Sequence, residues 1–93
     1  MRAIITGAAM GIGKAIAIEM AKEGAQLVLV DINEAALENT AQELTQRKAE
    51  IELVCGSVAD NSVAELSVSK AVEAFGGLDC LSHNAGIQRY GSV

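Results

Sequence analysis

The sequence predicts an α/β fold in which helices cover both faces of a doubly wound parallel sheet. Four short runs rich in apolar and β-branched residues alternate with three longer segments of helical periodicity, a pattern typical of strand–helix–strand units. The second short run, residues 27–30, is continuously apolar, as in a central strand buried on both faces. The chain has 93 residues, of which 51% are hydrophobic. This is enough for one aliphatic core and too little for two domains, so we expect one domain over residues 1–93.

The first strand is predicted over residues 3–6 and the first helix over residues 11–23. A glycine-rich turn separates them, and Gly24 follows the helix where a left-handed C-cap is expected. Apolar side chains at helical spacing predict the buried face of this helix. They are Ile12, Ala15, Ile16, Met20 and Ala21.

The second strand is predicted over residues 26–31, and Asn33 is expected to cap a helix that runs to about Arg47. The apolar face of that helix is predicted to hold Leu37, Ala41 and Leu44. A third strand follows over residues 51–55, because the run is apolar and rich in strand-forming residues.

The third helix is predicted to begin at a cap formed by Asp60 or Asn61 and to end at Gly76 and Gly77. Its predicted buried side holds Val68, Ala71, Val72 and Phe75. The fourth strand is predicted over residues 80–83.

Right-handed crossovers and helices on both faces predict the spatial strand order 3-2-1-4. This order puts Cys55 and Cys80 on well-separated strands, so a disulfide between them is excluded. Neither cysteine stands in a CxxC pair or beside a histidine cluster. We therefore expect both to be small, buried apolar residues, with no metal site.

Charge and hydropathy argue against two kinds of partner. Seven Lys and Arg residues are outnumbered by twelve Asp and Glu residues, for a net charge of −5. Such a chain would be repelled by a phosphate backbone, so we expect no nucleic-acid partner. No window approaches the roughly 18 consecutive apolar residues of a membrane span, and the first residues lack a leader pattern. We expect no membrane association and a cytoplasmic location.

The glycine-rich turn between the first strand and the first helix is the strongest local signal. Residues 6–13 read TGAAMGIG, with Gly7, Gly11 and Gly13. A diphosphate needs backbone amides that no Cβ shields, and a helix N-terminus supplies such donors together with a partial positive charge. The turn is therefore a candidate diphosphate site, and a turn of purely structural purpose is the alternative.

Asp31 ends the second strand 18 residues after Gly13, where a carboxylate can accept hydrogen bonds from an adenosine ribose. The same charge opposes a 2′-phosphate, and neither Met10 nor Ile32 carries a compensating positive charge. These residues favour NAD over NADP. The alternative is that Asp31 only begins the turn before Asn33.

These motifs resemble those of the short-chain dehydrogenases/reductases. That family combines a TGxxxGIG turn, an acidic residue after the second strand and an NNAG segment after the fourth, which here reads HNAG at residues 83–86. The resemblance implies that residues 1–93 form part of a Rossmann-like dinucleotide-binding domain, with its sheet truncated to about four strands. It places the cofactor diphosphate on the turn and the adenosine ribose on Asp31. The residues it implies at the cofactor are Gly7, Met10, Gly11, Ile12, Gly13, Asp31, Asn84, Ala85 and Gly86.

Two positions depart from the family pattern. Members often have Asp-Val after the third strand, with the Asp near the adenine amino group, whereas this chain has Ser57 and Val58. A serine hydroxyl can still accept a hydrogen bond, so both residues stay in the predicted site. His83 replaces the first Asn of NNAG. It is either a pH-sensitive group near the cofactor or a strand-end residue satisfied by the backbone.

The family's catalytic residues are missing from these 93 residues. In the family, a Ser and a YxxxK pattern move the proton while the nicotinamide moves hydride. Here Tyr90 is followed by only three residues, and Ser92 has no relay partner. We therefore expect the N-terminal, NAD-binding fragment of an oxidoreductase that interconverts alcohol and carbonyl groups. The complete enzyme would act on a small alcohol or ketone and be a homo-oligomer.

Two alternatives stay open. A stand-alone nucleotide-binding module without catalysis would use the same residues. A methyltransferase that uses S-adenosylmethionine shares a glycine-rich turn and an acidic residue after the second strand, but the TGxxxGIG spacing and residues 84–86 argue against it.

Overall fold

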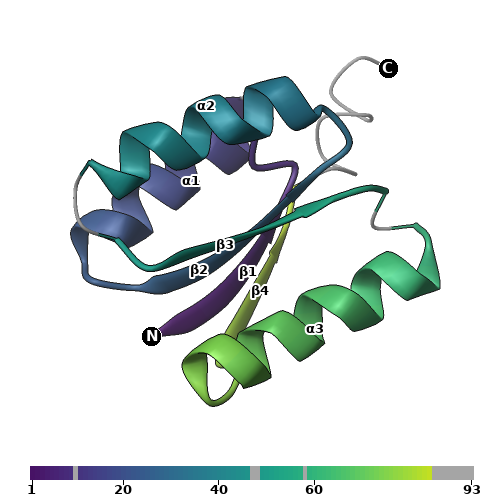
Figure 1. Cartoon of the computed structure of the whole chain (residues 1–93). Helices are drawn as coiled ribbons and strands as arrows, with labels where there is room; N and C mark the ends of the chain where they lie inside the picture. The colour runs from purple at the N-terminus through teal and green to yellow at the C-terminus, as the bar shows by residue number, and fades with distance from the viewer. Residues whose placement is uncertain (10, 47–48, 58, 85–93) are drawn as a thin grey trace.

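The computed structural model describes residues 1–9, 11–46, 49–57 and 59–84. Within these ranges, four strands and three helices alternate along the chain, as predicted (Figure 1). The elements are β1 (Arg2–Thr6), α1 (Gly11–Lys22), β2 (Gln26–Asp31), α2 (Glu34–Thr45), β3 (Ile51–Cys55), α3 (Asn61–Phe75) and β4 (Cys80–His83).

The strands form one parallel sheet in the order β3-β2-β1-β4, which confirms the predicted order. Helices α1 and α2 lie on one face of the sheet and α3 lies on the other (Figure 1). Right-handed crossovers require this, because the strand order runs outward from β1 to β3 and then returns past β1 to β4. The order therefore switches direction between β1 and β4, and open α/β sheets bind ligands at such a point.

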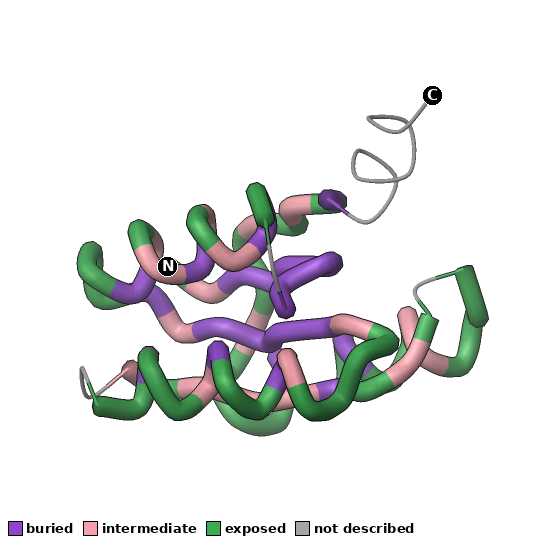
Figure 2. The backbone as a smooth tube through the Cα atoms, turned by 90° about the horizontal axis from the view of Figure 1, so that it is seen from above, coloured by how far each residue is buried: buried purple, intermediate pink, exposed green. Residues whose placement is uncertain are grey.

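The core has one part on each face of the two central strands. Residues 27–30 of β2 are almost completely buried, as their continuous apolar run predicts. In Figure 2 the central strands are coloured as buried, whereas much of the helix surface is coloured as exposed. The side chains facing α1 and α2 include Ala3, Ile5, Leu27 and Leu29. Those facing α3 are Ile4, Val28, Val30 and Val54.

The predicted buried face of α1 is wrong at two positions. Ile12 is 52% exposed, and Ala15 is exposed as well. Small residues spaced four apart face the sheet instead, because they let the helix approach the strands closely while larger side chains flank the contact. They are Gly13, Ala17 and Ala21. Ile16 and Met20 pack beside this row and are half-buried.

The predicted buried face of α3 is also wrong in part. Val68 and Val72 are exposed, Val72 by 51%, and the buried residues are Ser67 and Ala71. Ser67 can be buried because its Oγ donates a hydrogen bond to a backbone carbonyl oxygen of the preceding turn at 2.8 Å. Phe75 packs partly against the core, as predicted. The outer side of α3 is therefore more apolar than its sequence pattern predicts.

The helix ends agree with their predicted caps. The side chains of Asn33 and Asp60 each accept a hydrogen bond from a backbone N–H in the first turn of α2 and α3. The predicted end of the second helix at Arg47 lies outside the described residues, and α2 ends at Thr45. The described helices have 12, 12 and 15 residues. None of them is both long and apolar enough to cross a membrane.

The two cysteines lie on the two outer strands, with β2 and β1 between them. Both are free thiols, and their separation excludes a disulfide, as predicted. The prediction that both are buried is wrong, because Cys55 is exposed and Cys80 is half-buried. Cys55 is the last residue of β3, at the carboxyl end of an outer strand of the sheet.

Candidate cofactor-binding site

Within the described part of the chain, the glycine-rich turn, Asp31 and Asn84 lie at the carboxyl ends of β1, β2 and β4. The parallel register pairs Thr6 with Val30 on one side and with His83 on the other. The turns after these three strands therefore leave the sheet at the same edge, next to the point where the strand order switches direction. This edge carries the glycine-rich turn, Asp31 and Asn84.

The glycine-rich turn needs its glycines for two different reasons. Gly7 and Gly11 both have φ of 64°, in the left-handed region that favours glycine. Gly13 has no room for a side chain, since a Cβ there would lie 2.0 Å from the carbonyl oxygen of Gly7. The first turn of α1 carries no acidic side chain, so nothing on the helix itself neutralises its positive end. The turn and the helix N-terminus form a backbone surface suited to an anion.

The carboxylate of Asp31 joins this turn to the start of α2. Its Oδ2 accepts a hydrogen bond from the backbone N–H of Ala9 at 3.0 Å. Its Oδ1 accepts one from the N–H of Asn33 at 3.0 Å, so Asp31 also takes part in the turn before Asn33. An ionised carboxylate has about four acceptor positions, which leaves capacity for further donors. The protein thus orients the Asp31 carboxylate and leaves it able to accept further hydrogen bonds.

The surroundings of Asp31 carry negative charge. Desolvation of the thiol and the charge of Glu34 raise the pKa of Cys55, and Asp31 and Glu38 act in the same direction. Ile32, which directly follows Asp31, is an exposed apolar side chain. The carboxylates of Glu34 and Glu38 therefore carry negative charge close to Cys55, the residue of β3 that pairs with Asp31.

A hydroxyl connects β1 to β4 at the same edge. Thr6 Oγ1 accepts a hydrogen bond from the N–H of Asn84 at 3.0 Å and lies 3.4 Å from both the Ser82 carbonyl oxygen and His83 Nδ1. The Asn84 amide donates to Ser82 Oγ at 2.8 Å, and Asn84 is buried. His83 is exposed, and the contact described for its ring is with the Thr6 hydroxyl rather than with a backbone group.

Ser57 lies in the exposed turn between β3 and α3. Its Oγ accepts a hydrogen bond from the N–H of Ala59 at 3.2 Å, so its hydroxyl stabilises its own turn. The other predicted site residues, Met10, Val58, Ala85 and Gly86, lie outside the described residues.

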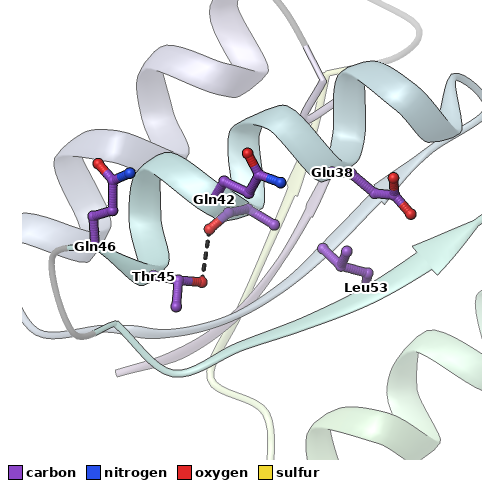
Figure 3. Close-up of a pocket in the computed structure, with 6 residues that line it drawn as sticks. Glu38, Gln42, Thr45, Gln46 and Leu53 are labelled. Atoms are coloured by element: carbon purple, nitrogen blue, oxygen red, sulfur yellow. Dashed lines mark hydrogen bonds between the residues drawn. The ribbon is translucent and has the colours of Figure 1, made fainter.

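A shallow groove between α2 and β3 lies apart from these residues (Figure 3). It is lined by Glu38, Ala41, Gln42, Thr45, Gln46 and Leu53. None of the predicted cofactor residues lines it, and it opens along the outer strand of the sheet rather than at the switch between β1 and β4. We therefore place the candidate site at the glycine-rich turn and not in this groove.

Sequence reasoning includes Thr6 and Ala9 in the glycine-rich motif but predicts no individual role for either, and it misses Thr40. Thr6 acts through its hydroxyl and Ala9 through its backbone N–H, which no residue pattern marks. Thr40 lies between Leu37 and Leu44 on the buried face of α2. This helical spacing is the one signal that could have singled it out.

Comparison with known proteins identifies a matching family. The profile described as short chain dehydrogenase matches residues 1–93. A CLA biosynthesis dehydrogenase/reductase of Lactiplantibacillus plantarum is 40% identical over 89 residues, which is 96% of this chain and 31% of that protein. An uncharacterized oxidoreductase of Thermotoga maritima is 41% identical over 90 residues, or 97% of this chain and 35% of that protein. The chain thus spans about a third of the length of these relatives.

Solved structures with the same fold include complexes with both nicotinamide cofactors. A short chain dehydrogenase/reductase of Burkholderia phymatum in complex with NAD has a TM-score of 0.83 and 38% identity, over 86% of this chain and 28% of that one. An alcohol dehydrogenase of Thermococcus sibiricus complexed with 5-hydroxy-NADP has a TM-score of 0.78 and 36% identity, over 86% and 34% of the two chains.

Proposed function

This chain belongs to the short-chain dehydrogenase family, and from that membership we propose that it is the NAD-binding part of an oxidoreductase that interconverts alcohol and carbonyl groups. When bound, the nicotinamide cofactor supplies or accepts the hydride of such a reaction. The contribution of the described residues is to bind and orient that cofactor.

The glycine-rich turn would hold the cofactor diphosphate. Gly7 and Gly11 turn the backbone through left-handed conformations, and Gly13 lets the N-terminus of α1 lie directly against the turn. Backbone N–H groups there would donate to the phosphate oxygens, and the helix dipole favours their charge. Met10 and Ile12 belong to the same proposed contact. The close packing of Gly13 on Gly7 is the observation that fits a diphosphate best.

Asp31 would accept hydrogen bonds from the adenosine ribose. Its carboxylate is fixed by the N–H groups of Ala9 and Asn33, and Glu34 adds negative charge nearby. A 2′-phosphate in that position would meet like charge. This arrangement supports NAD rather than NADP as the cofactor.

The remaining predicted residues would complete the cofactor site. We propose Ser57 and Val58 beside the adenine, and Asn84, Ala85 and Gly86 along the part of the cofactor that lies next to the sheet. The complete enzyme would use a small alcohol or ketone as substrate and would be a cytoplasmic homo-oligomer. The alcohol dehydrogenase among the similar structures supports this reaction class.

An NMR titration tests the binding site directly. As NAD is added to the isotope-labelled chain, we expect the backbone amide signals of the turn to shift first, namely those of Gly7, Ala9, Gly11 and Gly13. Signals from α3 should shift only at higher NAD concentrations. Shifts confined to the groove residues Gln42 and Gln46, or none in a folded chain, would contradict the proposed site.

A further inference from the structure

Thr40 is a fully buried polar residue in the middle of α2, with 0% of its surface exposed. Its Oγ1 lies 3.2 Å from the carbonyl oxygen of Ala36, one turn earlier in the same helix. That local bond alone would satisfy the hydroxyl. Oγ1 also lies 3.2 Å from the carbonyl oxygen of Ala9, which is 31 residues away in the glycine-rich turn. Oγ1 is thus within hydrogen-bond distance of both carbonyl oxygens, so Thr40 reaches beyond its own helix.

With this contact, both backbone polar groups of Ala9 are hydrogen-bonded. Its carbonyl oxygen accepts from Thr40, and its N–H donates to Asp31 Oδ2. Ala9 is itself buried, so an unpaired carbonyl there would be costly. The residue stands between Gly7 and Gly11, whose backbones have wide conformational freedom. Hydrogen bonds from β2 and α2 therefore fix the backbone of Ala9 in the glycine-rich turn, whose glycines alone would leave it conformationally free.

We propose that Thr40 is a positioning residue for cofactor binding. Its hydroxyl fixes Ala9, and the N–H of Ala9 in turn orients the Asp31 carboxylate toward the adenosine ribose. The inference rests on the proposed function, since it assigns Thr40 a part in the NAD site. It adds a residue of α2 that does not touch the cofactor.

The main test replaces the hydroxyl and keeps the side-chain shape. Thr40→Val is expected to weaken NAD binding by about three- to tenfold, the range expected for one hydrogen bond. Thr40→Ser restores the hydroxyl and should bind NAD nearly as well as the unsubstituted chain. A purely packing role would give the reverse order, because Ser leaves a cavity and Val does not.

Thr45 offers a matched control on the same helix. Its Oγ1 donates to the carbonyl oxygen of Ala41 at 2.7 Å, so Thr45→Val removes the same kind of local bond without touching the turn. Thr45→Val should leave NAD affinity unchanged. A loss equal to that of Thr40→Val would overturn the proposal, because a general effect on α2 would then explain both.

A double-mutant cycle tests whether Thr40 acts through Asp31. In an Asp31→Ala background, Thr40→Val should cause no further loss of NAD affinity, whereas independent contributions would add. If Thr40→Val does not fold, Thr40→Ala against Thr40→Ser supplies the same comparison. Additive losses, or normal binding by a folded variant without the hydroxyl, would contradict the proposal.

The amide signal of Ala9 separates this inference from the proposed function. Without any cofactor, Thr40→Val should shift that signal and speed its hydrogen exchange, while Thr45→Val should not. If the signal responds in this way but the unsubstituted chain binds no NAD, the proposed function fails, and only the contact between Thr40 and Ala9 is supported. If the signal does not respond, the positioning role fails even if NAD binds.

Discussion

The backbone of Gly13 packs against the carbonyl group of Gly7 so closely that a Cβ on Gly13 would lie 2.0 Å from the oxygen and 2.7 Å from the carbon. This contact joins the first residues of α1 to the end of β1. It sets the rotation of the helix, because the side of α1 that holds Gly13 must face the sheet. Ala17 and Ala21 are buried on that same side.

Gly13→Ala should therefore damage both stability and cofactor binding. The new methyl group meets backbone atoms that cannot rotate away, so α1 must shift, with an expected loss of about 1–3 kcal/mol in the free energy of unfolding. Urea denaturation measures this loss, and NAD titration measures the binding.

Gly24→Ala is the matched control for this substitution. Gly24 has φ of +83°, and no described atom lies within 4 Å of the place where its Cβ would stand. Alanine there meets backbone strain of about 1–2 kcal/mol but no clash. It should lower stability and leave NAD affinity intact. Normal NAD binding by Gly13→Ala would show that the glycine contact does not shape the site.

The ion pair between Arg2 and Asp79 should make stability depend on acid pH. Arg2 donates hydrogen bonds to both carboxylate oxygens of Asp79, and these lower the pKa of Asp79 from 3.8 to about 2. A carboxyl group whose pKa is lowered by folding stabilises the protein above its unfolded pKa. That contribution is lost as the pH falls from about 4 through about 2.

Urea midpoints measured between pH 5 and 2 check this, with Asp79→Asn as the comparison. The variant should be less stable at neutral pH and should lose less stability on acidification than the unsubstituted chain. Parallel pH profiles for the two chains would rule out this role for the ion pair.

The outer side of α3 and the free edge of β4 should make the 93-residue chain self-associate. Leu81 on β4 is 59% exposed, and β4 pairs only with β1 among the described residues. The opposite edge strand is better protected, since Lys70 Nζ donates to the Leu53 carbonyl oxygen of β3 at 2.8 Å. An open apolar edge favours pairing with another chain, and a charged side chain on it opposes such pairing.

Leu81→Lys should therefore reduce self-association in sedimentation velocity, while Leu66→Lys on the outer side of α3 should reduce it less. A monomeric chain with a sharp two-state melt would contradict this expectation. So would equal association before and after the Leu81 substitution.

The strands and their order could be predicted from the sequence, whereas the helix faces could not be predicted fully. Apolar runs such as residues 27–30 mark buried strands directly. The faces of α1 and α3 are set by small residues, Gly13 and Ala71 among them, which pack by close approach rather than by hydrophobicity. A pattern that counts large apolar residues therefore misplaces Ile12, Val68 and Val72.

Some residues of the candidate site could likewise be predicted from the sequence, and others could not. The glycine-rich turn and Asp31 could be located because turn conformation and charge demand particular residue types. The roles of Ala9 and Thr40 could not be predicted, because their contacts join distant parts of the chain. The Ala9 N–H donates to Asp31 across 22 residues, and the Thr40 hydroxyl contacts the Ala9 carbonyl oxygen across 31 residues. Such contacts appear only once the fold brings β2, the turn and α2 together.

Calorimetric titration of the chain with NAD and NADP, repeated for Asp31→Ala, tests the central claim most directly. Glu73→Gln, on the exposed surface of α3, controls for the loss of one negative charge. We expect the unsubstituted chain and Glu73→Gln to bind NAD more tightly than NADP, and Asp31→Ala to bind NAD more weakly and lose this preference. A folded chain that prefers NADP, or that binds NAD equally well without the Asp31 carboxylate, would contradict the account.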